Sequence, residues 1–227
     1  RQLKHHKRGL AELTYSVAAL AASDVRGAET HTRKAEKLLG KTPITLLLSA
    51  QIARSNGDDA KTRHLLEQLL DHKETEYLAA RSLSDAASKQ KLFPRALELA
   101  RRAHEVNPKD SSAVLAIVNL HLKLHQWQQA LRAIDKDARR GVLRRADMLR
   151  LRGLVHLSQG TAVLESGRSG DAIPHAKICL KHLPGFAPAT LFAGRVYVTV
   201  GQAEKAVRVL FASWKRYKHP QVGDMLH

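Results

Sequence analysis

Histidine is the residue type with the widest range of possible chemistry in this 227-residue chain, because its thirteen imidazoles can act as metal ligands or general bases. His121 and His125 are four positions apart, which places both on one face of a helix and is compatible with metal or haem ligation. No third ligand accompanies them, and the repeat described below puts His121 at a close-packed position and His125 in a turn. The sequence therefore predicts no metal site and no cofactor, with transient haem or porphyrin handling kept as an alternative.

The other candidates for catalysis are one thiol and two pairs of carboxylates. Cys179 is the single cysteine, so an internal disulfide and a zinc knuckle are excluded, and its repeat position predicts a buried, inert thiol. Asp58–Asp59 and the pair Asp135 and Asp137 fall in turns or on helix surfaces, where carboxylates are ordinarily solvated. The chain contains no nucleotide-binding glycine loop, zinc-protease motif or nucleophile elbow. We therefore expect a protein that is not an enzyme and has no catalytic residues.

The charge of the chain predicts an anionic partner. Its 38 Lys and Arg against 21 Asp and Glu give a formal net charge of +17, which suits nucleic acid, an acidic protein or a lipid surface. Six arginines lie within Arg139–Gly153. A protein helix that binds nucleic acid would gather its cations in one stripe beside aromatic or amide side chains. If the stretch is helical, Arg145 and Arg150 point to different sides of the helix. Nucleic-acid binding is therefore an alternative and not the main expectation.

Apolar residues at helical spacing run along the chain, broken by short polar turns, and no alternating strand pattern occurs. A small residue early in each second helix recurs at Ala28, Thr62, Ala96, Ala130, Ala172 and Ala206. The steps are 34, 34, 34, 42 and 34 residues. A period of 34, with small residues where two helices cross, is the pattern of the tetratricopeptide repeat (TPR). The sequence predicts an all-α, TPR-like α-solenoid of about six helical hairpins that form a right-handed superhelix, rather than a non-repetitive bundle.

The single 42-residue step marks an insertion of eight residues between Ala130 and Ala172. Gly141 is expected to end the fourth unit and the next helix to begin early, near Arg144, which extends that helix by about two turns. We expect one continuous solenoid domain. Its expected segments are a basic leader over residues 1–8, units one to four over 9–140, and units five and six over 141–227.

The first helix of each hairpin lines the concave groove of a TPR array, and basic residues outnumber acidic ones at these positions. The repeat phase assigns a partner-binding role to Gln51, Arg54, Arg81, Lys89, Asn119, Lys123 and Arg195. Asn119 and Lys123 share one helix face, where an amide can hydrogen-bond a peptide backbone and an ammonium can pair with a carboxylate. Solvated helix surface is the alternative for each residue taken singly. The collective basic bias predicts a groove for an acidic protein segment.

Four longer strings carry a resemblance that is more specific than the repeat. They are TPITLLLSAQIARSNGDD, ETEYLAARSL, RALELARRAHEVNPKDSSAVL and PGFAPATLFAGRVYVTVGQAEKAVRVLFASWKRYKHPQV. In their order they resemble the TPR part of the proteobacterial HemY-type membrane proteins, which are encoded among haem-biosynthesis genes. The resemblance covers nearly the whole chain. It implies an inner-membrane protein with two amino-terminal transmembrane helices, a cytoplasmic TPR domain, an accessory role in haem or porphyrin metabolism, and no catalytic residues.

The membrane helices that the resemblance implies are not in this chain, so membrane attachment is expected through segments outside it. The string RQLKHHKR carries four fixed positive charges and no acid. Behind transmembrane helices, the positive-inside rule places such a segment on the cytoplasmic side, where anionic headgroups attract it. We therefore expect a scaffold for protein–protein interactions on the cytoplasmic side of a bacterial inner membrane, with haem-pathway enzymes as partners.

Overall fold

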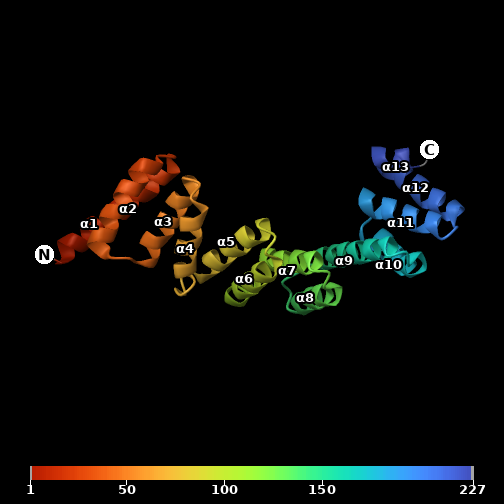
Figure 1. The fold of residues 1–227 in the computed structure, drawn as a ribbon, viewed down its shortest axis with the longest axis horizontal. Coiled ribbons are helices and arrows are strands. Elements are labelled where there is room, and N and C mark those ends of the chain that lie inside the picture. The colour runs from red at the N-terminus through yellow and green to blue at the C-terminus, as the bar shows by residue number, and fades with distance from the viewer. Residues whose placement is uncertain (1, 226–227) are drawn as a thin grey trace. The chain divides into compact units, whose positions relative to one another are not determined.

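The computed structural model describes residues 2–225, and within them every regular element is helical. The described helices pair into six antiparallel hairpins, followed by one short final helix, and Figure 1 labels them in chain order. In each hairpin we call the first helix the A helix and the second the B helix. The prediction of an all-α, TPR-like solenoid with about six hairpins is confirmed.

The chain divides into two compact units, residues 1–108 (unit 1) and 109–227 (unit 2). Unit 1 contains α1 (Gln2–Ala21), α2 (Val25–Leu39), α3 (Pro43–Ser55), α4 (Asp59–Leu69), α5 (Glu76–Lys89) and α6 (Phe93–Val106). Unit 2 contains α7 (Ser111–Lys123), α8 (Trp127–Arg139), α9 (Arg145–Glu165), a 3₁₀ turn (Ser169–Asp171), α10 (Ala172–His182), α11 (Ala187–Thr199), α12 (Ala203–Tyr217) and α13 (Pro220–Asp224). Each unit thus holds three hairpins.

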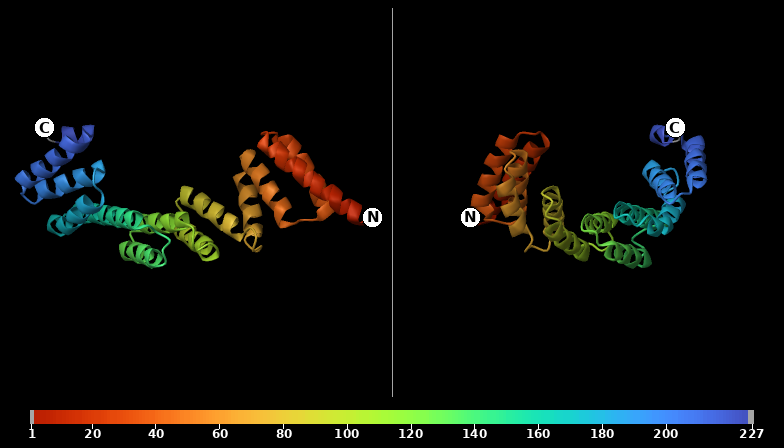
Figure 2. Two further views of the ribbon diagram at one scale, coloured as in Figure 1. Left: turned by 180° about the vertical axis from the view of Figure 1, so that it is seen from behind. Right: turned by 45° about the vertical axis from the view of Figure 1, so that its right-hand side comes forward.

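The division into two compact units is independent of the repeat segments expected from the sequence, whose bounds stay a prediction. It falls after Pro108, because the contacts of α7 are with the later helices. Described residues of the basic leader form the first turns of α1, since nothing between Gln2 and Ala21 breaks a helix. Position 9 inside this helix is suited to glycine, because an added Cβ there would lie 2.5 Å from the side chain of Leu39. Both views of Figure 2 show α1 and α2 lying side by side.

Small residues lie where the two helices of a hairpin cross, as the repeat pattern requires. The Ser16 hydroxyl donates to the carbonyl of Ala28 at 3.2 Å, and Ser84 donates to that of Ala96 at 2.8 Å. In the fifth hairpin the A-helix position is Gly160, where an added Cβ would lie 2.7 Å from the Cβ of His175. All six B-helix positions of the 34-residue pattern are buried, from Ala28 to Ala206. The periodicity in the sequence therefore reflects close helix contact.

A turn with a left-handed residue ends the A helix of every hairpin. The residues with positive φ at these turns are Ser23, Gly57, Lys91, His125, Gly167 and Gly201. They repeat at the same 34-residue steps, with the single 42-residue step. In the first hairpin, the amide of Asp24 bonds to the carbonyl of Ala19 at 2.8 Å, and the other turns have the equivalent bond. This Schellman arrangement satisfies carbonyls at the helix end that would otherwise lack partners.

Three of the six arginines in the stretch that leads into α9 form ion pairs with neighbouring acids. Helix α9 has 21 residues, whereas the A helices α3, α7 and α11 have 13 each. Arg152 donates twice to one oxygen of Asp135, at 2.6 and 3.2 Å, and Arg144 pairs with Asp147 at 2.8 Å. These contacts join α9 to α8 and close its first turn. The stretch is therefore a joint between hairpins, as the sequence analysis expected.

Candidate partner-binding groove

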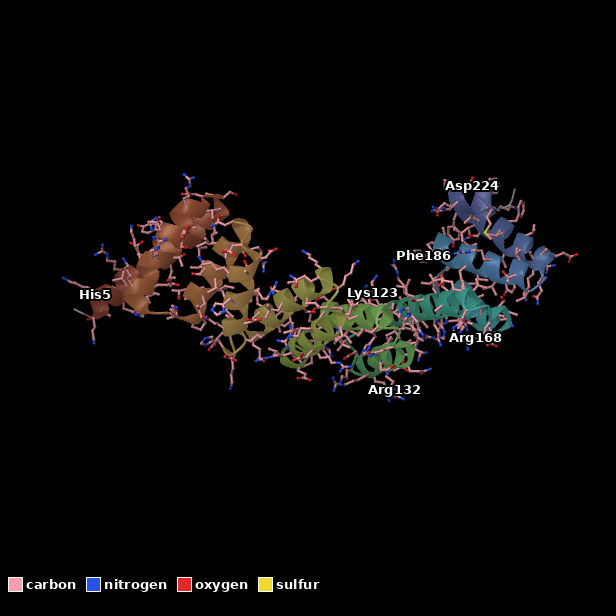
Figure 3. All side chains as sticks on the ribbon, viewed as in Figure 1. His5, Lys123, Arg132, Arg168, Phe186 and Asp224 are labelled. Carbon is pink, nitrogen blue, oxygen red and sulfur yellow. The ribbon has the colours of Figure 1, made fainter. Side chains whose placement is uncertain are left out.

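The seven residues assigned to the groove all lie on A helices, and all seven are exposed. Unit 1 carries Gln51 and Arg54 on α3 and Arg81 and Lys89 on α5, whereas unit 2 carries Asn119, Lys123 and Arg195. The assignment to partner binding therefore stays a prediction for two separate surfaces. In Figure 3, Lys123 at the end of the A helix α7 and Arg132 on the B helix α8 lie on opposite sides of their hairpin.

A polar hollow lies between α3, α4 and α5 of unit 1. Its charged lining residues are Arg54, Asp59, Arg63, Asp85 and Lys89. Within residues 2–225 these three cations form no ion pair, so their charges are available to an incoming group. Arginine and lysine side chains in such a position favour a carboxylate.

An apolar hollow adjoins the polar one on the same unit. Its lining includes Leu20 from α1, Leu47 and Leu48 from α3, and Leu78 from α5. Gln51 and Arg54 border it, and Arg54 also borders the polar hollow. The predicted residues Gln51, Arg54 and Lys89 are thus brought together around two adjacent hollows. Arg81 instead donates to the phenol oxygen of Tyr77 at 3.1 Å on the exposed surface of α5.

Unit 2 has a hollow that the sequence analysis did not foresee. Arg150 and Leu154 of α9 line it together with His182 and with Phe186, the residue before α11. Figure 3 labels Phe186 at the start of α11. The sequence treated Arg150 as one of several scattered cations. The available signal in the sequence was Phe186, a large apolar residue directly before a helix. A pattern that considers only the faces of helices does not include such a residue.

The two histidines that suggested metal chemistry do not share a helix face. His121 is buried, and its Nδ1 lies 2.8 Å from Oε1 of Gln126. His125 lies beyond the end of α7 in the left-handed turn, with its ring edge-on to Trp127. No group of three or more metal-ligating side chains occurs among the described residues. The structural roles expected for both residues agree with these contacts.

A histidine pair that sequence spacing could not reveal joins α9 to α10. The Nδ1 atoms of His156 and His175 lie 3.0 Å apart, so one ring donates to the other. Burial lowers the pKa of both rings below the ordinary value, and the charges of His175, His182 and Arg152 lower that of His156 further. At neutral pH the pair is uncharged and serves as a hydrogen-bonded contact between the helices.

The thiol has the environment expected from the sequence, whereas the acidic pairs do so only in part, because Asp137 is buried on α8 and not solvated. Cys179 is fully buried, its Sγ lies 3.6 Å from the carbonyl of Gly153, and burial raises its pKa to about 12. The side chain of Asp58 accepts from the amide of Lys61 at 2.9 Å and so caps α4. A thiol with that pKa is protonated and unreactive, and a capping carboxylate has a structural role.

Comparison with known proteins supports the fold and gives no family. No protein-family model matches the chain, and no curated protein matches it either. Several solved structures do, among them that of MamA, with 15% identity and a TM-score of 0.56 over 79% of this chain and 94% of that one. YrrB, described as a TPR protein with an unusual peptide-binding site, has 16% identity and a TM-score of 0.55 over 84% and 94%.

A third similar structure is larger than this chain. The complex of Naa15 and Naa10 bound to HypK-THB matches with 13% identity and a TM-score of 0.65, over 98% of this chain and 34% of the matched chain. At these identities the likeness establishes the TPR solenoid fold alone. Among residues 2–225, none of the helices combines the length and the apolar character needed to cross a bilayer.

Proposed function

We propose that this protein is a non-enzymatic TPR scaffold that binds segments of other proteins on the exposed faces of its A helices. The observation that carries the proposal is the pair of adjacent hollows in unit 1, where Arg54 borders an apolar and a polar surface. The cations there have no ion-pair partners among the described residues. A TPR fold suits this role because stacked hairpins expose an extended binding surface. The peptide-binding site named for YrrB is consistent with it.

We further propose that the scaffold organises enzymes of haem or porphyrin biosynthesis on the cytoplasmic side of a bacterial inner membrane. The support is the resemblance of four strings of the sequence to HemY-type proteins. A second support is the first turns of α1, where Lys4, Lys7 and Arg8 are exposed and suited to contact with anionic headgroups. Membrane attachment itself would come from segments outside this chain.

Charge reversal in the hollow tests the scaffold function. The double variant Arg54→Glu, Lys89→Glu reverses two of the three cations that line the polar hollow. The control Arg132→Glu, Lys136→Glu on α8 makes the same change of charge on a B helix. Crosslinking and affinity capture from the native cell should recover haem-pathway enzymes with the wild type and the control. The groove variant should lose at least about 90% of that recovery.

Two results would contradict different parts of the proposal. Equal loss in the groove variant and the control would show that bulk charge and not the groove holds the partner. Recovery of partners that include no haem-pathway enzyme would reject the pathway while leaving the scaffold function in place. Circular dichroism of both variants should match the wild type, because all four side chains are exposed.

A further inference from the structure

A row of exposed apolar side chains occupies one repeat position on the three A helices of unit 1. Leu10 of α1, Ile44 of α3 and Leu78 of α5 are 34 residues apart and are 48%, 42% and 43% exposed. The equivalent residues of unit 2 are Ser112, Leu154 and Pro188, of which only Leu154 is a large aliphatic side chain, and it is half-buried. The apolar row is therefore a property of unit 1.

One member of the apolar row, Leu78, borders the apolar hollow of unit 1. Leu78 lines that hollow together with Leu20 and Leu47. Because Leu10 and Ile44 hold the repeat position of Leu78, they project from the corresponding faces of α1 and α3. An apolar hollow lined by a large apolar side chain that is nearly half exposed, such as Leu78, marks an interaction surface more than an ordinary solvated one.

Charged side chains follow the apolar row further along the same helices. On α3, Ile44 and Leu47 precede Arg54, and on α5, Leu78 precedes Asp85 and Lys89. Arg54 and Lys89 both line the polar hollow. The exposed face of the A helices thus consists of an apolar row beside a charged row in which the cations predominate. A partner that matches it must be apolar along one edge and acidic along the next.

The spacing of the row distinguishes a helical partner from an extended one. Of the three A helices, α1 and α3 are in contact, and packed helices lie roughly 10 Å apart, which corresponds to about seven residues of an α-helix or about three of an extended strand. Residues seven apart lie on the same side of a helix, whereas residues three apart lie on opposite faces of a strand. Leu10 and Ile44, which lie on these two helices, can therefore be reached from one side of a partner helix.

We propose that unit 1 binds an amphipathic α-helix of a partner protein, with apolar residues at heptad spacing over Leu10, Ile44 and Leu78 and acidic residues on the flank that meets Arg54 and Lys89. This inference rests on the scaffold function proposed above and specifies its ligand. It assigns recognition to residues 1–108 and gives the row Leu10, Ile44, Leu78 the role of an apolar anchor site.

Peptides of defined pattern test this ligand on the full chain. The probe is a capped, fluorescent helical peptide of about 15 residues with leucine at every seventh position and glutamates along one flank. One control peptide has the same composition with the leucines distributed around the helix, and another has lysine in place of glutamate. Fluorescence anisotropy should show binding of the probe at least about tenfold tighter than that of either control.

Two substitutions locate the site. Leu78→Glu should weaken binding of the probe at least about tenfold, because it places a carboxylate in the apolar row and opposite the acidic flank. Val207→Glu is the matched control, since Val207 is 54% exposed on the B helix α12 of unit 2, and it should leave the affinity unchanged. Circular dichroism checks that both variants keep their helical content.

Several outcomes would overturn the proposal. It is wrong if the rearranged peptide binds as tightly as the probe, if no peptide binds, or if Leu78→Glu has no effect. Self-association that Leu78→Glu abolishes would identify a second copy of this chain as the occupant instead. Any of these results leaves the scaffold function standing if cellular capture still depends on Arg54 and Lys89, so the two proposals fail separately.

Discussion

Gly160 provides the sharpest test of how the hairpins pack. We expect Gly160→Ala to destabilise unit 2 although it adds a better helix former to the middle of α9. An added Cβ would lie 2.5 and 3.0 Å from ring atoms of Phe192 and 2.7 Å from the Cβ of His175. Phe192 is almost fully buried, and the Cβ of His175 moves only with the backbone of α10. Neither neighbour can move aside without shifting its helix.

The magnitude follows from two opposing terms. Replacing glycine by alanine within a helix stabilises it by about 1 kcal/mol, and overpacking a well-filled contact destabilises by about 1–3 kcal/mol. Three contacts below 3.1 Å, one of them to a backbone-anchored atom, place this site toward the upper end of that range. We therefore expect the free energy of unfolding of unit 2 to fall by about 1–2 kcal/mol.

The assay uses the placement of the two tryptophans. Trp127 and Trp214 both belong to unit 2, so urea unfolding followed by tryptophan fluorescence reports on that unit. The midpoint should fall while the slope stays constant, because the exposed surface of the unfolded state is the same. Gly170→Ala is the control, since an added Cβ there meets nothing within 4 Å. A rise in stability for Gly160→Ala would refute the reasoning, because it would show helix propensity acting without overpacking.

Three further measurements check other features. Gly57 and Lys91 both adopt positive φ, a conformation that favours glycine. Gly57→Ala should therefore lower the stability of unit 1 by about 1 kcal/mol, whereas Lys91→Gly should leave it unchanged or raise it by up to about 1 kcal/mol. Thermal unfolding of both variants shows whether the two changes in stability have opposite signs. Cys179, with a pKa of about 12, should not react with a thiol reagent at pH 8 until the chain unfolds, and rapid labelling of the folded protein would contradict its burial. The pKa values of His156 and His175 are lower in the folded than in the unfolded chain, so below about pH 6.5 the unfolded chain binds more protons than the folded one. The stability of unit 2 should therefore fall as the pH drops through that value. Replacing both histidines by glutamine should flatten this dependence, and an unchanged pH profile would exclude the pair as its source.

The fold could be predicted because the residues that determine it repeat in the sequence. The period of Ala28, Thr62 and Ala96 identifies where helices cross, and these residues are buried in the structure. The left-handed turns escaped prediction because the sequence signal for such a turn is glycine, and three of the six turns have Ser23, Lys91 or His125 instead. The repeat phase could have located these turns, since they occur at the same steps as the small residues.

The candidate site could be predicted only in part. Repeat position predicted that Gln51, Arg54 and Lys89 lie on the exposed faces of A helices, because a helix face follows from spacing alone. Which of these side chains border a common hollow depends on how far α3, α4 and α5 lie apart, and a periodic pattern does not contain that distance. The contact between His156 and His175 likewise depends on two different helices. Partner binding at the seven predicted residues stays a prediction.

The length of α9 has a consequence for how this chain can tolerate changes of size. Its eight extra residues amount to about 2.2 helical turns, so the end of the helix is rotated by about 80° from its orientation in a 13-residue A helix. An insertion of two residues would rotate the end of the helix by about 200° and carry Val155 out of the core. The length of this helix can therefore change with the least rotation of its end in steps close to whole turns.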